Sequence, residues 1–228
     1  MHTEAQQKRT FHILPDVFFI SFNRFINDKK ETSKNPFPPH TTSTLQQDAF
    51  RRLGFSARQT MRIAQQLYEG VSLHEGSTGL ITYMRTDSVN LSQEALGGAK
   101  QFIESEYGQR YSLPVPRQFK TKSKGAQEAH EAIRPTDPAR MPDSIKDSLD
   151  SAQYKLYNLI WRRFIATQMP PAIFDSTAVD IEALNKKQEA LNFTFRATGQ
   201  VMKFDGFLKI YPMKFSETLL PELAPKDP

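Results

Sequence analysis

The spacing of apolar residues changes at Pro170-Pro171, and this change limits the fold classes open to the chain. Before the two prolines, the longest predicted helix, 152–169, carries an apolar stripe at helical spacing. After them, apolar and polar residues alternate over 177–182 and 193–198, and 206–211 continues in the same style. The sequence therefore predicts an α+β fold, in which a mainly helical part is followed by antiparallel strands.

Capping residues mark the other helices of the first part. One helix begins at a cap among Thr42, Ser43 and Thr44 and runs to about Leu53. Ser56 caps a second helix over 57–68, and Ser92 caps a third that ends near Tyr107. The first two, joined by a short turn at Gly54, predict a helix-turn-helix-like corner. Two packed helices that contact no nucleic-acid groove are the alternative.

The remaining segments divide the chain into four parts. Apolar residues between 11 and 26 predict one or two strands, and 27–35 is interpreted as a polar linker. Residues 79–86 are predicted as a short buried strand, 112–125 as a basic loop and 126–133 as a short helix. The predicted parts are an N-terminal segment 1–35, a helical domain 36–169, a β segment 170–212 and a tail 213–228.

Composition excludes several classes of site. The 228 residues include no cysteine, which rules out disulfides, thiolate zinc sites and a cysteine nucleophile. The five histidines are scattered, and no apolar run is long enough to cross a bilayer. The most apolar stretch, 11–22, is interrupted by Pro15 and Asp16 and lacks the cleavage site of a signal peptide. A formal charge of +5 favours a polyanionic partner without requiring one.

A tyrosine and an arginine two residues apart form the first candidate site. On a strand, Ile81, Tyr83 and Arg85 would share one face. Tyrosine is a poor nucleophile unless its phenolate, with a reference pKa near 10, is stabilised. A guanidinium can stabilise that phenolate and can also hold a phosphate. The spacing alone does not distinguish this chemistry from an ordinary buried tyrosine.

A second candidate follows in 127–135, where His130 and Arg134 would share a helix face. Histidine can carry a proton or, when charged, bind phosphate, although a surface helix explains the pattern equally well.

A third candidate is a set of basic residues that could form a phosphate track, or could simply be a solvated face. Its members are Arg51, Arg52, Arg58, Arg62, Arg117, Lys120, Lys122 and Lys124.

Five motifs in one order give these patterns a more specific meaning. They are 42–47 (TSTLQQ), 53–55 (LGF), 60–70 (TMRIAQQLYEG), 79–88 (GLITYMRTDS) and 127–136 (QEAHEAIRPT). With them, the chain resembles the bacterial DNA topoisomerase I family, of type IA, over about residues 35–210. The stretches 83–88 and 130–136 resemble the bacterial type I branch rather than the type III branch.

The resemblance implies a role for individual residues. Tyr83 matches the nucleophile that attacks a DNA phosphate and forms a 5′-phosphotyrosyl link, which lets the strand be resealed after another strand passes. Arg85 matches the residue that steadies the phosphate, and His130 a histidine near the scissile phosphate. The matched motifs also contain residues with supporting or DNA-binding roles: Gln65, Glu69, Thr82, Thr86, Asp87 and Arg134.

The resemblance also implies an architecture and several absences. Residues 36–169 would be the helical gate domain, and 170–212 the returning strands of an incomplete arch domain. The family's acidic metal-binding module is missing, since no D-x-D occurs in the chain, and His40 stands where an apolar or aromatic residue is expected. We therefore expect a fragment whose Mg²⁺ ligands lie elsewhere, inactive alone in relaxing supercoiled DNA.

The expected partners are single-stranded or negatively supercoiled DNA and the missing N-terminal module in trans, with no membrane partner and a cytoplasmic, nucleoid-associated location. Two alternatives stay open at this point. One is a non-catalytic remnant that binds single strands through basic and aromatic contacts. The other is a degenerate gene product without function.

Overall fold

The computed structural model describes residues 21–74, 76–119, 130–184, 190–213 and 220. The chain divides into two compact units. One comprises 1–32, 174–201 and 216–228 and is called the strand unit; the other comprises 33–173 and 202–215 and is called the helical unit. The α+β class predicted from the sequence is confirmed.

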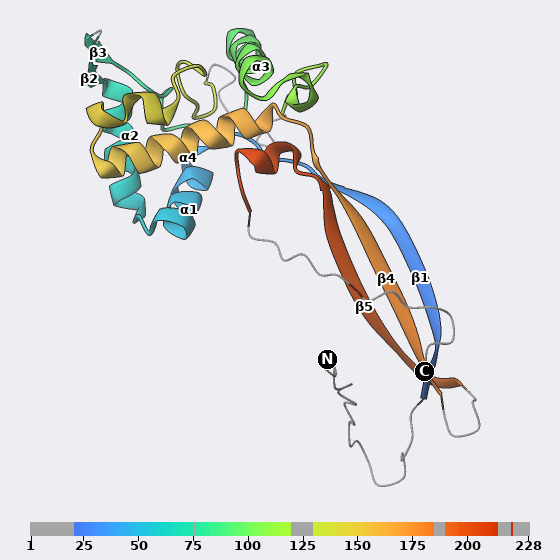
Figure 1. Cartoon of the computed structure of the whole chain (residues 1–228). Coiled ribbons are helices and arrows are strands. Elements are labelled where there is room, and N and C mark those ends of the chain that lie inside the picture. Colours follow the sequence, from blue (N-terminus) through green and yellow to red (C-terminus); the bar gives the residue numbers. More distant parts are fainter. Residues whose placement is uncertain (1–20, 75, 120–129, 185–189, 214–219, 221–228) are drawn as a thin grey trace, which may run out of the picture. The chain divides into compact units, whose positions relative to one another are not determined.

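Three long strands lie side by side in one sheet: β1 (Ser21–Lys34), β4 (Ala172–Leu184) and β5 (Ala190–Phe204), in the order β1-β4-β5 (Figure 1). The Oγ1 atom of Thr32, near the end of β1, lies 2.8 Å from Oγ of Ser176, near the start of β4, so these strands are antiparallel. Five residues separate β4 from β5, too few for a parallel crossover. The predicted antiparallel strands are therefore present.

The polar linker predicted over 27–35 is wrong, because β1 continues through Lys34. This part of the strand pairs with β4, and its side chains from 29 to 31 are exposed. Backbone hydrogen bonds to β4, rather than buried side chains, hold this part of the strand in place. Its sequence therefore lacks the alternation of apolar and polar residues that would predict a strand. The apolar residues from 11 to 20 lie outside the described residues.

The four helices begin and end within two residues of the predicted positions. They are α1 (Thr42–Leu53), α2 (Ala57–Glu69), α3 (Gln93–Tyr107) and α4 (Ser151–Thr167). Ser56 and Ser92 cap α2 and α3 as predicted, whereas α1 and α4 are capped one residue earlier than expected, by Thr41 and Asp150. Gly54 ends α1 in a left-handed conformation, which forms the tight corner to α2.

Helix α4 forms the centre of the helical unit and packs against α1 and α2 (Figure 1). Its predicted stripe, including Leu156, Ile160 and Phe164, is fully buried. Trp161 is also buried, and its Nε1 donates to the carbonyl of Pro138 at 2.9 Å. The single tryptophan of the chain therefore reports on the packing of this unit.

Two segments predicted in β style are not strands. Residues 79–86 contribute only an isolated bridge at Ile81, and 206–209 form a 3₁₀ helix, η3 (Gly206–Lys209). Gly206 has φ +49°, and a Cβ there would lie 2.4 Å from the carbonyl oxygen of Pro171. The chain therefore turns at Gly206 instead of continuing β5.

Several short elements were not predicted. They are the antiparallel hairpin of β2 (Val71–Leu73) and β3 (Gly76–Thr78) and the 3₁₀ helices η1 (Gln109–Tyr111) and η2 (Pro142–Ser148). Across the described part of the chain, no helix combines the length and the apolar character needed to span a membrane.

Candidate active site

The segment that carries Tyr83 is extended and is held by a distant part of the chain. The amide of Thr82 donates to the carbonyl of Arg134 at 2.9 Å, and Thr82 Oγ1 donates to the carbonyl of Ala132 at 2.7 Å. Ile81 forms an isolated bridge with Pro135. The 80–82 and 132–136 segments thus fix each other, although neither forms a regular strand.

The N-terminus of α1 holds the other end of this segment. Thr42 Oγ1 donates to the carbonyl of Met84 at 2.8 Å and accepts from the amide of Thr86 at 2.9 Å. The amide of Thr42 also donates to the carbonyl of Thr86 at 2.8 Å. Thr82 and Thr86, predicted as supporting residues, thus hold the backbone on either side of Tyr83, and their role in the chemistry stays a prediction.

Side chains alternate between inside and outside after Ile81. Tyr83, Arg85 and Asp87 are exposed, whereas Met84, Thr86 and Ser88 are buried. The predicted common face of Ile81, Tyr83 and Arg85 is wrong for Ile81, which is only 1% exposed. The extended backbone still brings Tyr83, Arg85 and Asp87 to one side of the segment, at the surface.

Tyr83 lies between two other rings. Its centroid is 5.5 Å from that of Tyr68, in an edge-to-face arrangement, and 6.1 Å from that of His130. Tyr83 is 41% exposed, and its hydroxyl forms no hydrogen bond with another described residue. The two neighbours fix the plane of the ring while the hydroxyl stays open to a ligand.

A hollow opens beside this tyrosine at the first turn of α1. It is lined by Arg85, Asp87 and His130 together with residues at the start of α1, and we call it the α1 hollow: Thr41, Thr42, Ser43, Gln46, Arg85, Thr86, Asp87 and His130. The amides of Thr42 and Thr44 already donate to the carbonyl of Thr86 and to Oγ1 of Thr41, but the dipole at the N-terminus of α1 still favours an anion, and Arg85 adds a full positive charge. The α1 hollow is therefore suited to a phosphate group.

The short helix predicted over 126–133 is wrong where the structure describes it. Residues 130–135 are extended, and 126–129 lie outside the described residues. His130 and Arg134 therefore do not share a helix face. His130 reaches the α1 hollow, because hydrogen bonds to Thr82 hold its segment against the tyrosine loop.

Arg134 is turned away from the α1 hollow and forms an internal ion pair. Its NH2 lies 2.6 Å from Oε2 of Glu131, and Glu131 also accepts from the amide of Ser92. Burial disfavours the charged form of Glu131, but the hydrogen bond and charge of Arg134 outweigh it and lower the pKa of the carboxyl. The pair ties the His130 segment to the start of α3.

Gln65 and Glu69 also lie away from the α1 hollow. They are one turn apart on α2, and the Gln65 amide donates to the Glu69 carboxylate. Their helix nevertheless carries Tyr68, which touches Tyr83. Sequence reasoning did not select Tyr68, because fifteen positions and an unpredicted hairpin separate it from Tyr83.

The predicted basic track is divided by the structure. Arg117 donates to the carbonyls of Thr167 and Met169 at 2.6 and 2.9 Å, so it satisfies the C-terminal end of α4 instead of facing a ligand. Arg52 pairs with Asp48, whereas Arg51, Arg58 and Arg62 are exposed. The three lysines 120, 122 and 124 lie outside the described residues.

The donor set of the α1 hollow does not fit a magnesium ion. Mg²⁺ prefers several oxygen ligands, usually carboxylates with water or phosphate. Asp87 is the one acidic residue lining the hollow. No cluster of three or more potential metal-ligating side chains occurs among the residues that the structure describes.

Comparison with known proteins connects this geometry to one family. A family model described as DNA topoisomerase matches residues 24–227. The DNA topoisomerase 1 of Rickettsia felis is 45% identical over 207 residues, which are 88% of this chain and 26% of that protein. The DNA topoisomerase 1 of Xylella fastidiosa is 50% identical over 183 residues, which are 80% of this chain and 22% of that protein.

A solved structure shows the same fold. Full-length topoisomerase I from Thermotoga maritima matches with a TM-score of 0.74 at 35% sequence identity. The match covers 90% of this chain and 31% of that one. The chain thus spans about a quarter of the length of the curated relatives named above.

Proposed function

We propose that Tyr83 cleaves and rejoins single-stranded DNA through a 5′-phosphotyrosyl intermediate, because the chain belongs to the DNA topoisomerase family of type IA. One observation carries the proposal. An exposed tyrosine stands beside a hollow that combines the N-terminus of α1, Arg85 and His130. Such a hollow can hold the phosphate that the tyrosine attacks.

The proposed step is a transesterification without net oxidation or reduction. The Tyr83 oxygen forms a bond to phosphorus, and the bond from phosphorus to the 3′ oxygen breaks. The tyrosine hydroxyl loses a proton, and the released 3′ oxygen gains one. Rejoining reverses each change, so the energy of the broken phosphodiester is kept in the phosphotyrosyl bond. Passage of another strand between the two reactions would relax negative supercoils.

Arg85 and the start of α1 supply the positive field for this step. Negative charge builds on the non-bridging phosphate oxygens in the transition state, and fixed donors aimed at that charge lower its energy. Removing one such donor costs about 10²- to 10³-fold in rate in well-studied enzymes. We expect a loss of that order in Arg85→Gln.

We propose that His130 acts on the same phosphate. Its ring is near that of Tyr83 and lines the α1 hollow. Imidazole can pass a proton or, when charged, can pair with phosphate oxygens. Both roles predict slower cleavage in His130→Gln, with a changed pH profile.

Magnesium would be held mainly by carboxylates from outside the α1 hollow, which offers one acidic side chain, Asp87. The metal would add positive charge at the DNA phosphates. We therefore propose that the chain binds DNA alone but needs the family's acidic module, supplied in trans, to relax supercoiled DNA.

A labelled single strand tests the proposal. The chain is incubated with 5′- or 3′-labelled DNA and Mg²⁺, with and without the acidic module, and is then denatured and run on a gel. We expect an adduct that retains only DNA on the 3′ side of the break and that is lost in Tyr83→Phe. Tyr154→Phe, which removes the hydroxyl of a tyrosine outside the α1 hollow, is the matched control.

The competing function is a DNA-binding module without covalent chemistry. The exposed arginines of α1 and α2 would suffice for it. A folded chain that binds single strands but forms no adduct under either condition would favour that function and reject the proposed one.

A further inference from the structure

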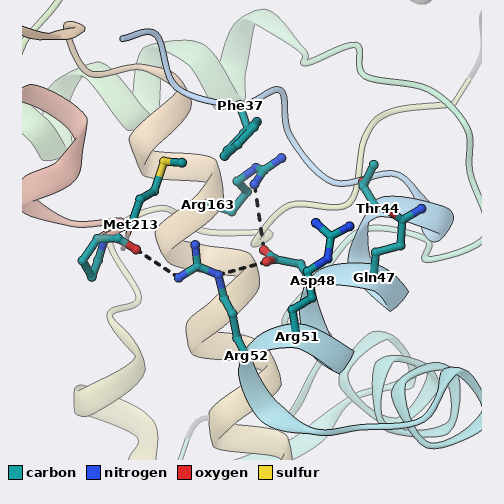
Figure 2. A pocket seen from close by; sticks show the side chains of 9 residues that line it. Phe37, Thr44, Gln47, Asp48, Arg51, Arg52, Arg163 and Met213 are labelled. Carbon is teal, nitrogen blue, oxygen red and sulfur yellow. Dashed lines mark hydrogen bonds and ion pairs between the residues drawn. The ribbon is translucent and has the colours of Figure 1, made fainter. Parts of the chain in front are cut away.

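A second hollow in the helical unit lies on another side of α1 and takes no part in the site described above. We call it the arginine pocket and define it by Phe37, Thr44, Asp48, Arg51, Arg52 and Arg163 (Figure 2). Arg51, Arg52 and Asp48 come from one face of α1, and Arg163 comes from α4. Residues far apart in the sequence thus converge on one place.

The arginine pocket carries an excess of positive charge. Three guanidinium groups face one carboxylate, which leaves two positive charges unbalanced. That carboxylate is fully engaged: Asp48 lies 2.9 Å from Arg52 Nε and 3.8 Å from Arg163 NH1, and it accepts from the Tyr211 hydroxyl. An anionic ligand would therefore meet cations that Asp48 does not neutralise.

Arg163 is a cation fixed in place before any ligand arrives. It is 7% exposed, its Nε donates to the carbonyl of Pro38 at 2.7 Å, and its guanidinium lies over the rings of Phe37 and Tyr211 at 4.6 and 5.3 Å. Burial lowers the pKa of Arg163, although Tyr211 and Asp48 act in the opposite direction.

The titratable neighbour behind Asp48 does not change this balance. His40 is completely buried, and its Nε2 lies 3.6 Å from Asp48 Oδ2. Burial, with Arg163 and Arg52 opposing protonation and Asp48 favouring it, lowers the pKa of His40 to about 3. The ring is therefore neutral near pH 7, and the arginines remain the source of positive charge.

Arg51 and Phe37 form the open side of the pocket. Arg51 is exposed, and no hydrogen bond or ion pair joins it to another described residue, so its planar fork can take a phosphate in bidentate fashion. Phe37 is 45% exposed although it touches Arg163, which leaves ring surface for a base. Cations beside an open aromatic ring are typical of single-strand binding sites.

We propose that the arginine pocket binds a backbone phosphate of single-stranded DNA at a second point, with a base stacked on Phe37. The inference rests on the proposed function only in taking DNA as the ligand. Consecutive residues of α1 line the two hollows, Ser43 the α1 hollow and Thr44 the arginine pocket. A strand that follows this helix can therefore contact both.

Binding of labelled oligo-dT tests the pocket, measured by fluorescence anisotropy at several salt concentrations. The background is Tyr83→Phe, so that no covalent product forms and failure of the chemistry cannot imitate failure of the pocket. We expect Arg51→Gln to weaken binding about tenfold at low salt and to reduce the slope of log K against log salt by about 0.7. Arg58→Gln removes the same charge from an exposed arginine of α2 and is the matched control.

Equal effects of Arg51→Gln and Arg58→Gln would overturn the proposal, because they would show diffuse attraction instead of a site. An unchanged affinity in Arg51→Gln would do the same. Neither substitution removes a buried group, and circular dichroism verifies that both variants are folded.

A second arm separates a DNA phosphate from a free one. Pyrophosphate competes with oligo-dT, and Phe37→Leu removes the stacking surface. We expect Phe37→Leu to weaken oligo-dT more than pyrophosphate. If Arg51→Gln weakened pyrophosphate while leaving oligo-dT unchanged, the pocket would be a site for small anions and the proposal would be wrong.

Discussion

Replacing Thr42 by valine removes one hydroxyl and keeps the shape of the side chain. That hydroxyl donates to the carbonyl of Met84 at 2.8 Å and accepts from the amide of Thr86 at 2.9 Å. Both partners flank the Tyr83 segment, and both residues are buried. The substitution therefore leaves one buried acceptor and one buried donor without their bonds to α1.

The expected cost follows from these two groups. A buried polar group left unpaired costs about 1–3 kcal/mol. Thr42 itself is only half-buried, and its amide still donates to the carbonyl of Thr86, so water and the remaining bond reduce the sum. We expect Thr42→Val to lower the free energy of unfolding by about 2 kcal/mol.

Urea denaturation followed by Trp161 fluorescence measures this loss, because the single tryptophan is buried in the helical unit. With an m-value of about 2 kcal/mol/M, the midpoint falls by about 1 M. Thr78→Val is the matched control, since Thr78 makes only a 3.4 Å local bond. A loss in Thr42→Val no larger than in the control would refute the reasoning. The adduct yield at Tyr83 should fall with Thr42→Val, because the tyrosine segment loosens.

Four further substitutions test other parts of the structure. Folding lowers the pKa of Glu131, so its ion pair stabilises the folded chain at pH values above the pKa of the unfolded state. This stabilisation is lost as the pH falls through the pKa of the folded state. The difference in free energy of unfolding between wild type and Glu131→Gln should therefore disappear in acid. His40 stays neutral in the folded chain because its pKa is lowered to about 3, whereas in the unfolded chain it takes up a proton below about pH 6.5. The free energy of unfolding should therefore fall with pH below about 6.5, and His40→Phe should make that fall less steep. Gly206→Ala should destabilise by more than about 2 kcal/mol, because its Cβ meets the Pro171 carbonyl. Gly54→Ala, with a similar φ but open space, should cost about 1 kcal/mol in the same urea titration.

The helices could be predicted because their ends depend on local chemistry. Ser56 and Ser92 each accept a hydrogen bond from an amide three residues later, and this pattern is readable in the sequence. The long strand β1 was missed in its polar half, because pairing with β4 rather than side-chain burial holds it. Such pairing depends on a partner more than a hundred positions away.

The candidate site was predicted only in part. Tyr83, Arg85 and His130 were selected through the family resemblance, and the structure brings all three to one place. Their spacing alone suggested a strand and a helix, and both predictions were wrong, because reciprocal bonds between Thr82 and the Arg134 segment fix two extended loops instead. Local periodicity contains no information about such a contact.

The arginine pocket could not be predicted from the sequence either. Arg51 and Arg52 were recognised as part of a basic set, but Arg163 was not selected as a candidate. Only the packing of α4 against α1 places these charges together. A charge count along the chain therefore cannot locate the pocket.

The proposed covalent intermediate is tested most directly by identifying the protein atom that becomes bonded to the DNA. A single strand with sulfur in place of the bridging 3′ oxygen releases a thiol on cleavage, which rejoins poorly and so preserves the intermediate. The trapped adduct, formed with the acidic module present, is digested and mapped by mass spectrometry. We expect one nucleotide-bearing peptide, modified at Tyr83 through a 5′ phosphate. Modification of another residue, or no adduct from a folded chain that binds the strand, would contradict the proposal.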